Sequence, residues 1–98
     1  MKKASRHRKL LPFDAARYLT DEAAVTEYMN AVLESGDADL LILALGDIAR
    51  TRGMAQVAKD TGLGRESLYK ALSPEGNPEF ATVLKVIRAL GLKLKVAM

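Results

Sequence analysis

Four polar side chains recur at close intervals over residues 65–70 and could bind another molecule through hydrogen bonds. If residues 65–72 form a helix, positions i, i+1, i+4 and i+5 share one face of it. These positions hold Arg65, Glu66, Tyr69 and Lys70. An arginine can bond to O6 and N7 of guanine, and a glutamate can accept a bond from the amino group of cytosine. We therefore expect a surface that contacts base edges in DNA; the alternative is that Arg65 and Glu66 are only an exposed charge pair.

Polar residues around this surface are expected to contact the DNA backbone. Lys59, Ser67 and Lys70 suit phosphate contacts, which position a protein without reading sequence. Gln56 is either a phosphate contact or an ordinary surface residue, and Tyr69 could instead belong to the core or to a helix cap. The complete expected DNA-binding set is Gln56, Lys59, Arg65, Glu66, Ser67, Tyr69 and Lys70.

The composition gives little support to catalysis or to metal binding. The chain has no cysteine and a single histidine, His7. Disulfides, a thiol nucleophile and a zinc site built from cysteine and histidine are therefore excluded. A lone histidine in a segment without apolar periodicity is not a positioned general base. We expect no enzyme activity, no catalytic residue, no metal and no cofactor.

Two short helices joined across a glycine are expected to position the polar surface. They cover residues 54–61 and 65–72, and Gly62 supplies the positive φ that the turn between them needs. Ala58 is small where the second helix crosses the first. The residues that point inward and hold the pair together are Val57, Leu63, Leu68 and Leu72. This is the form of a helix-turn-helix.

Two longer helices are expected before this pair. Thr20 can cap a helix that runs to about Ser35, and Gly36 can end it in the left-handed conformation. Asp37 can cap a second helix over residues 38–52, which Gly53 ends. The six apolar residues that begin at Leu40 could also form a buried strand, but helical spacing continues through Ile48 and Ala49 and favours the helix. The core face expected for the first helix is Val25, Tyr28, Met29, Val32 and Leu33.

One more helix is expected after the short pair. Asn77 can cap it with Pro78 at its first position, where the missing N–H costs nothing, and Gly91 ends it. Its expected core face is Phe80, Val83, Leu84, Ile87 and Leu90.

Residues 92–98 alternate between apolar and mostly polar side chains, which is the period of a half-buried strand. Nothing else in the chain reads as a strand, so its backbone groups need a partner. Pairing with the same segment of a second copy would give a homodimer, joined through Leu92, Leu94 and Val96. The alternative is that the segment lies on its own helices as an extended cover.

Charge is distributed unevenly along a chain of 98 residues with net charge +3. Residues 1–9 carry +5, residues 20–48 carry −7 and residues 49–98 carry +5. We expect a basic half that meets a polyanion and an acidic half that meets a different partner, although each run could be only a solvated face.

The expected organisation is a flexible basic arm over residues 1–13 and one domain over residues 14–98. The arm could enter a minor groove, contact the DNA backbone or only aid solubility.

The chain has no apolar stretch near the 18 residues of a membrane span, and its N-terminus lacks the features of a signal peptide. We therefore expect a soluble, cytoplasmic protein with no membrane partner.

Several blocks of the sequence resemble known families. Residues 57–63 and 68–72, Val-Ala-Lys-Asp-Thr-Gly-Leu and Leu-Tyr-Lys-Ala-Leu, resemble the helix-turn-helix of Cro and Xre repressors. Further blocks resemble the addiction-module antidote proteins, which are HigA-like antitoxins paired with RelE/ParE-type toxins. They are Phe13–Ala16, Ala44–Arg50, Arg52–Met54, Thr61–Leu63, Arg65–Leu72 and Gly76–Val86.

The resemblance implies an all-α fold: a five-helix, Xre/Cro-repressor-like helix-turn-helix domain, to which we add the short C-terminal β-strand. It implies an antitoxin that neutralises a small ribonuclease-type toxin and represses the operon they share by binding double-stranded operator DNA. Two departures from Xre domains stand out: Met54 replaces a phosphate-binding glutamine, and Gly64 replaces a Ser or Thr cap.

The toxin is expected on the acidic N-terminal half. The candidate toxin-binding residues are Phe13, Asp14, Arg17, Tyr18, Glu27 and Glu34. The alternative function is a free-standing Xre-family transcriptional regulator with no toxin partner.

Overall fold

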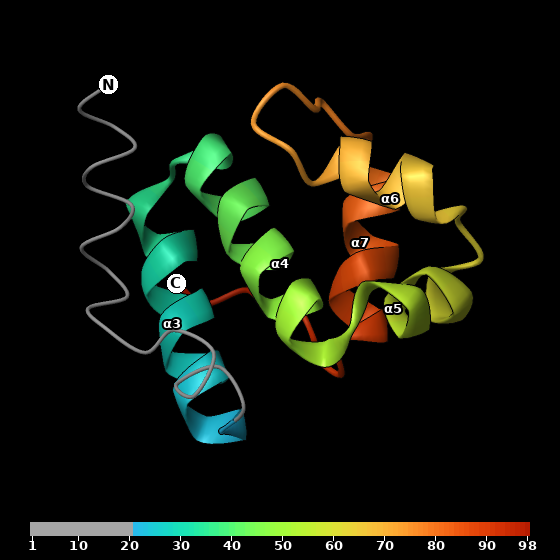
Figure 1. Cartoon of the computed structure of the whole chain (residues 1–98). Helices are drawn as coiled ribbons and strands as arrows, with labels where there is room; N and C mark the ends of the chain where they lie inside the picture. The colour runs from blue at the N-terminus through green and yellow to red at the C-terminus, as the bar shows by residue number, and fades with distance from the viewer. Residues whose placement is uncertain (1–20) are drawn as a thin grey trace.

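The computed structural model describes residues 21–98, which form five α-helices and no strand (Figure 1). The first 20 residues, including the expected basic arm, lie outside the described range. The helices, with the labels of Figure 1, are α3 (Glu22–Ser35), α4 (Ala38–Arg52), α5 (Met54–Thr61), α6 (Arg65–Ala71) and α7 (Phe80–Ala89). An all-helical fold with five helices is confirmed over this range.

Helix α3 begins one residue later than the sequence suggested. Its cap is Asp21, whose side chain accepts a hydrogen bond of 3.1 Å from the backbone N–H of Ala23. Gly36 ends the helix in the left-handed conformation, as expected, with φ 69°. The buried face holds Val25, Tyr28, Met29 and Val32. Leu33 was expected in the core but is 41 % exposed, because it lies at the edge of the apolar stripe.

Helix α4 is the central helix of the fold. The Asp37 carboxylate caps it by accepting a bond of 3.2 Å from the Leu40 N–H, and Gly53 ends it with φ 105°. The alternative of a buried strand from Leu40 is therefore wrong. At Gly46 a Cβ atom would lie 3.2 Å from the carbonyl oxygen of Leu72, so the glycine lets the end of α6 approach α4 closely.

Helix α7 starts later than predicted. Asn77 does not cap it and Pro78 is not its first helical residue; Glu79 holds the cap position without a side-chain hydrogen bond. The tight turn after α6 explains this. Gly76 donates to the carbonyl of Ser73, and a Cβ on Gly76 would collide with the Lys70 carbonyl oxygen. Asn77, Pro78 and Glu79 therefore lie between this turn and the first residue of α7.

The buried face of α7 is also displaced from the expected one. It consists of Val83, Val86 and Ile87, continued by Leu90. Phe80 is 67 % exposed although it lies one heptad before the buried Ile87, because the side chain of the first residue of a helix points back beyond the helix end. Leu84 lies at the edge of the buried face and is only half-buried.

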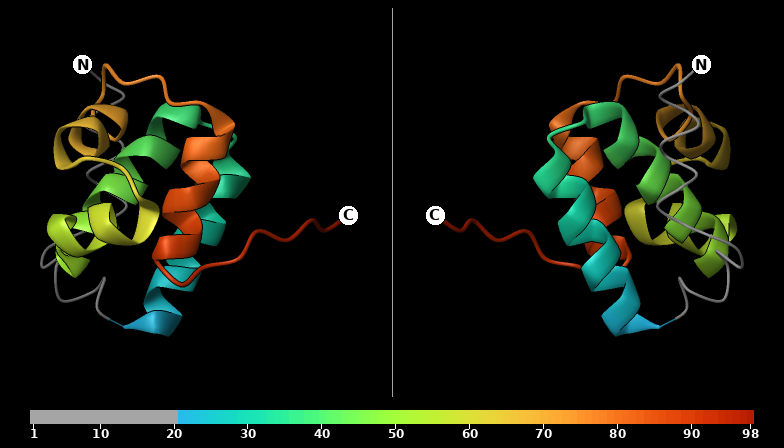
Figure 2. Two further views of the ribbon diagram at one scale, coloured as in Figure 1. Left: turned by 90° about the vertical axis from the view of Figure 1, so that its right-hand side faces the viewer. Right: turned by 90° about the vertical axis from the view of Figure 1, so that its left-hand side faces the viewer.

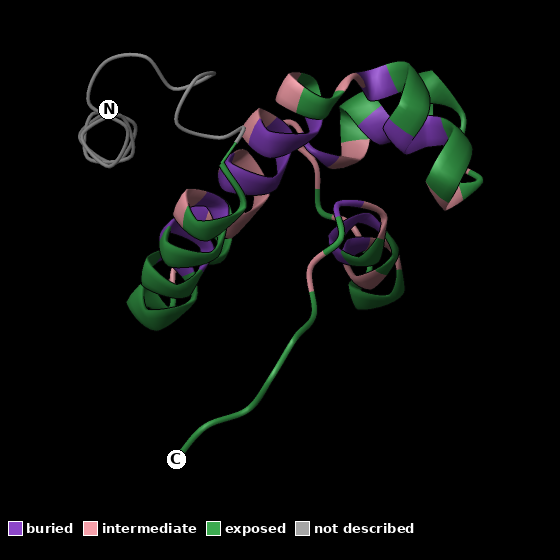
Figure 3. Ribbon diagram, turned by 90° about the horizontal axis from the view of Figure 1, so that it is seen from below, coloured by how far each residue is buried: buried purple, intermediate pink, exposed green. Residues whose placement is uncertain are grey.

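The five helices enclose one hydrophobic core, to which each of them contributes (Figure 3). Helices α3 and α4 pack against each other, and α5 packs against α4, α6 and α7. The pair α5 and α6 lies on the opposite side of the molecule from α3 (Figure 1). A bond of 3.0 Å from Arg52 Nη1 to the Leu90 carbonyl ties the end of α4 to the end of α7.

The predicted C-terminal strand is absent. Residues 92–98 are extended but unpaired, and they run away from the body of the molecule (Figure 2). Leu92 is half-buried against the core, whereas Leu94 is 39 % and Val96 95 % exposed. The alternative of a cover over the protein's own helices is wrong for all but Leu92. A strand cannot form here because residues 21–98 contain no sheet with which it could pair.

In the described residues, no helix has the length and apolar character needed to cross a membrane.

Candidate nucleic-acid interface

The turn between α5 and α6 sets the geometry of the candidate interface. Gly62 has φ 79°, and its N–H bonds to the carbonyls of Ala58 and Lys59 at the end of α5. The Thr61 hydroxyl donates to the Ala58 carbonyl at 3.1 Å and accepts from the Leu63 N–H at 3.2 Å. Two backbone and two side-chain bonds therefore fix the direction in which the chain enters α6.

Apolar side chains on the inner faces hold the two helices together. Val57 and Ala58 on α5, Leu68 on α6 and Leu72 at its end are all buried, and Leu63 is half-buried against the core. All the residues that the sequence assigned to this packing are on the inner side. Because Leu68 is 0 % exposed, the side of α6 that carries it is the side packed against the core.

The outer side of α6 carries the polar residues that the sequence singled out. Arg65, Glu66, Ser67 and Lys70 are exposed, and Tyr69 is 43 % exposed. The alternative that Tyr69 belongs to the core is therefore wrong. Within residues 21–98, the side chains of Arg65, Glu66 and Lys70 make no hydrogen bond or ion pair. Their donors and acceptors are available to another molecule.

Gln56 and Lys59 are exposed on α5, but Gln56 already has a partner. Its Nε2 donates to Asp60 Oδ1 at 2.9 Å, one turn further along the helix. A phosphate contact from Gln56 would have to replace this bond. Met54 is 5 % exposed and belongs to the core, so this position cannot contact a phosphate.

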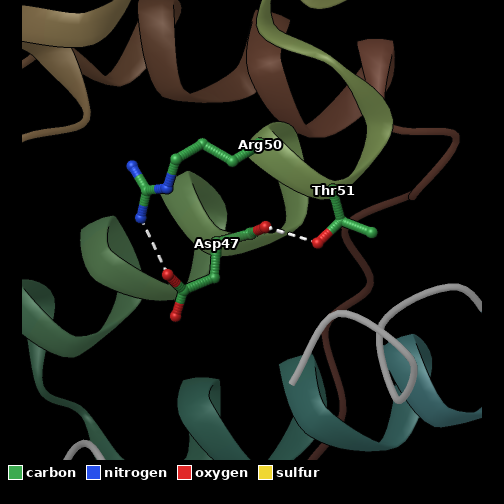
Figure 4. Close-up of polar contacts among 3 residues, drawn as sticks. All are labelled: Asp47, Arg50 and Thr51. Carbon is green, nitrogen blue, oxygen red and sulfur yellow. Dashed lines mark hydrogen bonds and ion pairs between the residues drawn. The ribbon is translucent and has the colours of Figure 1, made fainter. Parts of the chain in front are cut away.

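Arg50 is a cation near this region that the sequence analysis did not select. Its Nη2 pairs with Asp47 Oδ1 at 2.8 Å, while Thr51 donates to the Asp47 carbonyl (Figure 4). The guanidinium nitrogens lie 3.4 Å from the Cβ position of Gly46, which is also the point approached by the Leu72 carbonyl. The spacing of Asp47 and Arg50, three residues apart on one helix, is a signal that could have identified this pair.

A second feature missed from the sequence is an open groove between the end of α5 and α7. Its volume is about 410 Å³, and it is lined by Asp60, Thr61, Lys85, Arg88 and Ala89. Lys85 and Arg88, three residues apart on α7, are exposed cations.

The surfaces assigned to protein partners are only partly within the described range. Glu27 and Glu34 are exposed on α3, one heptad apart and so on one face of it. Phe13, Asp14, Arg17 and Tyr18 lie outside the described residues. Of the expected dimer residues, Leu94 and Val96 are exposed and Leu92 is half-buried. Self-association through them stays a prediction.

Comparison with known proteins defines the family. The family model described as probable addiction module antidote protein matches residues 9–98. The chain therefore belongs to the family of probable addiction module antidote proteins. An uncharacterized protein of Haemophilus influenzae is 51 % identical over 88 residues, which cover 90 % of this chain and 91 % of that protein. No solved structure matches the chain.

Proposed function

We propose that the protein is the antitoxin of a toxin–antitoxin module, acting in the cytoplasm by binding rather than by catalysis. In this proposal it neutralises a RelE/ParE-type toxin and represses its own operon through operator DNA. The observation that carries the proposal is the combination of antidote-family membership with α6, whose buried Leu68 fixes an outer row of unpaired polar side chains.

The DNA-binding part of the proposal treats α5 and α6 as a helix-turn-helix. Helix α6 enters the major groove, where Arg65 and Glu66 read base edges, and Tyr69 contacts a thymine methyl group or a phosphate. Lys59, Ser67 and Lys70 bind phosphates. Two copies would place their α6 helices about 34 Å apart on successive major grooves.

The toxin-binding part of the proposal uses the acidic half of the chain. Residues 20–48 contain seven acids and no base, and within them Glu27 and Glu34 are exposed on one face of α3. A toxin that binds RNA needs a basic surface to meet the phosphates, and oppositely charged surfaces associate quickly. Helix α3 lies away from α5 and α6 (Figure 1), so one molecule could hold toxin and DNA together.

Co-expression with the neighbouring reading frame tests the central claim. If that frame encodes the toxin, it should arrest growth when expressed alone, and this protein should restore growth. Footprinting of the purified protein on the DNA upstream of the two frames tests the repressor part. Normal growth with the neighbouring frame alone would contradict the antitoxin assignment.

A free-standing transcriptional regulator is the second candidate, favoured by the same unpaired residues on α6. Such a regulator would bind operator DNA although no adjacent reading frame encodes a small basic protein. A footprint of this protein on the operator, without rescue of growth, would favour the regulator.

A further inference from the structure

A carboxylate holds the guanidinium of Arg50 on an exposed side of α4. Arg50 Nη2 donates to Asp47 Oδ1 at 2.8 Å, three residues earlier on the same helix (Figure 4). The side chain of Arg50 nevertheless stays 49 % exposed. A guanidinium has five N–H donors, and the remaining donors of Arg50 make no hydrogen bond within residues 21–98. Arg50 is therefore a cation held in place whose other donors are open to another molecule.

The guanidinium lies beside the C-terminal end of α6. Both of its terminal nitrogens are 3.4 Å from the Cβ position built on Gly46, and the carbonyl oxygen of Leu72 is 3.2 Å from the same point. Leu72 is the residue that ends α6. A side chain at position 46 would fill the space that Arg50 and the end of α6 share, and glycine leaves that space open. The fold thus brings a cation of α4 next to the helix for which DNA contact is proposed.

The ion pair of Asp47 and Arg50 contributes little to the stability of the fold. Pairs between exposed side chains three residues apart on a helix are screened by water and add only a small part of the unfolding free energy. The Asp47 side chain is 38 % exposed, and the Arg50 side chain is more exposed still. The pair therefore matters more for where it places the guanidinium than for holding the helices together.

Phosphate is the ligand that suits the open donors of Arg50. A planar guanidinium binds a phosphate through two parallel N–H bonds, whereas a lysine acts only as a point charge. The major groove is about 12 Å wide, close to the diameter of a helix, so a sugar–phosphate strand runs along each side of a helix that lies in it. The last turn of α6 already carries one exposed cation, Lys70. A basic toxin would be repelled at this point, whereas DNA would be attracted.

We propose that Arg50 is a phosphate-binding residue of the DNA interface and that Asp47 positions it. In the complex, Arg50 binds a phosphate of the strand that passes the C-terminal end of α6. Asp47 keeps the guanidinium in place before DNA arrives, which lowers the loss of side-chain freedom on binding. The contact positions the protein and reads no base. This inference rests on the proposed function, because it requires α6 to bind DNA.

Arg50→Ala gives the first test, with Arg88→Ala as the matched control. The probes are two labelled duplexes, one from the DNA upstream of the two reading frames and one with the same bases scrambled. Arg50→Ala should weaken binding to both probes about tenfold or more, and the salt slope should fall by about 1. Arg88 is also an exposed arginine but lies on α7, so its removal should weaken binding by less than about threefold.

Thermal unfolding separates phosphate binding from a structural role of Arg50. Arg50→Ala should unfold within about 3 °C of the full chain, because an exposed ion pair on one helix adds little stability. Weaker DNA binding with an unchanged salt slope and a clearly lower unfolding temperature would overturn the proposal, since Arg50 would then only hold the end of α6 in place. Equal DNA binding by Arg50→Ala and Arg88→Ala would overturn it as well.

Removal of the carboxylate tests the positioning role of Asp47. Asp47→Ala and Glu75→Ala each remove one negative charge, the first at the ion pair and the second in the turn after α6. If charge alone mattered, both variants would bind DNA more tightly, because each loses a group that repels phosphate. We expect this only of Glu75→Ala, and Asp47→Ala should bind both probes about threefold or more weakly than Glu75→Ala does. Equal affinities of the two variants would show that Asp47 does not position Arg50.

The outcomes also separate this inference from the function on which it rests. If the full chain protects no upstream DNA and binds neither probe, the DNA-binding part of the proposed function is wrong, and the role of Arg50 falls with it. If the full chain binds the upstream duplex and Arg50→Ala binds it equally well, only the role of Arg50 is wrong.

Discussion

In the proposed complex with DNA, the exposed residues of α6 divide into those that read base edges and those that bind only phosphate. Arg65 and Lys70 are both exposed cations without a partner in residues 21–98, yet their chemistry differs. A guanidinium matches the two acceptors of guanine, whereas an ammonium acts as a point charge toward phosphate. Their distinct roles can be tested by substitution.

Arg65→Ala should cost about 1–3 kcal/mol of operator binding and relax base preference at one position. Lys70→Ala should weaken binding to all sequences alike and lower the salt slope by about 1. Titrations of operator and scrambled duplexes at several salt concentrations measure both effects. Lys85→Ala, an exposed cation on α7, is the matched control and should retain base preference. Unaltered operator footprints in both α6 variants would refute the assignment.

Two glycines beside the same turn should respond to substitution with opposite signs. Gly62 has φ 79° with no atom within 4 Å of a built Cβ, so Gly62→Ala should lose about 1–2 kcal/mol of unfolding free energy from backbone strain alone. Gly64 caps α6 with φ −69° and no side-chain bond. Gly64→Ser should therefore gain a few tenths of a kcal/mol by supplying the missing cap. Urea unfolding of the two variants measures the difference, and equal stabilities would contradict it.

At the scale of elements, Leu68 is the side chain by which α6 itself enters the core. Leu68 is 0 % exposed and is the one residue within α6 that is buried. Leu68→Ala should lower the unfolding free energy by about 2–5 kcal/mol, because it leaves a cavity under the helix. Phe80→Ala, at a residue 67 % exposed, should change it by less than about 0.5 kcal/mol. Thermal unfolding of the two variants compares them directly; a larger loss for Phe80→Ala would place that ring in the core.

Sequence patterns predicted elements wherever local chemistry sets their ends. Asp37 and the glycines after α3, α4 and α5 are local signals, and these ends lie where expected. The start of α7 depends instead on Gly76 meeting carbonyls of α6, a contact that no local pattern contains. The period of residues 92–98 is that of a strand, but a strand also needs a neighbour, and residues 21–98 provide none.

For the candidate site, the exposed row of polar residues on α6 was predictable from helical periodicity. The groove lined by Lys85 and Arg88 was not, because it depends on how α7 packs on α5.

Across the whole molecule, charge and position change together. The acids before residue 49 lie on α3, in the turn after it and on α4 as far as Asp47. After residue 49 the excess of bases belongs to the end of α4, to α6 and α7, and to the C-terminal segment, which passes α3 (Figure 2). The acids of α3 favour a basic protein there, and the bases of α6 favour DNA on the other side.

Reversing charge on α3 should therefore weaken toxin binding without removing DNA binding. Glu27→Lys combined with Glu34→Lys changes two exposed positions one heptad apart, so the loss of attraction falls on one face of the helix. Association with the product of the neighbouring frame should slow by about tenfold or more at low salt, and the difference should shrink as salt screens the charges.

The control is Glu75→Lys combined with Glu79→Lys, which makes the same change in net charge at exposed positions between α6 and α7. Stopped-flow association rates at two salt concentrations compare the pairs. Equal slowing by both would mean that total charge alone governs association, and full neutralisation by the α3 variant would remove that helix from the toxin-binding surface.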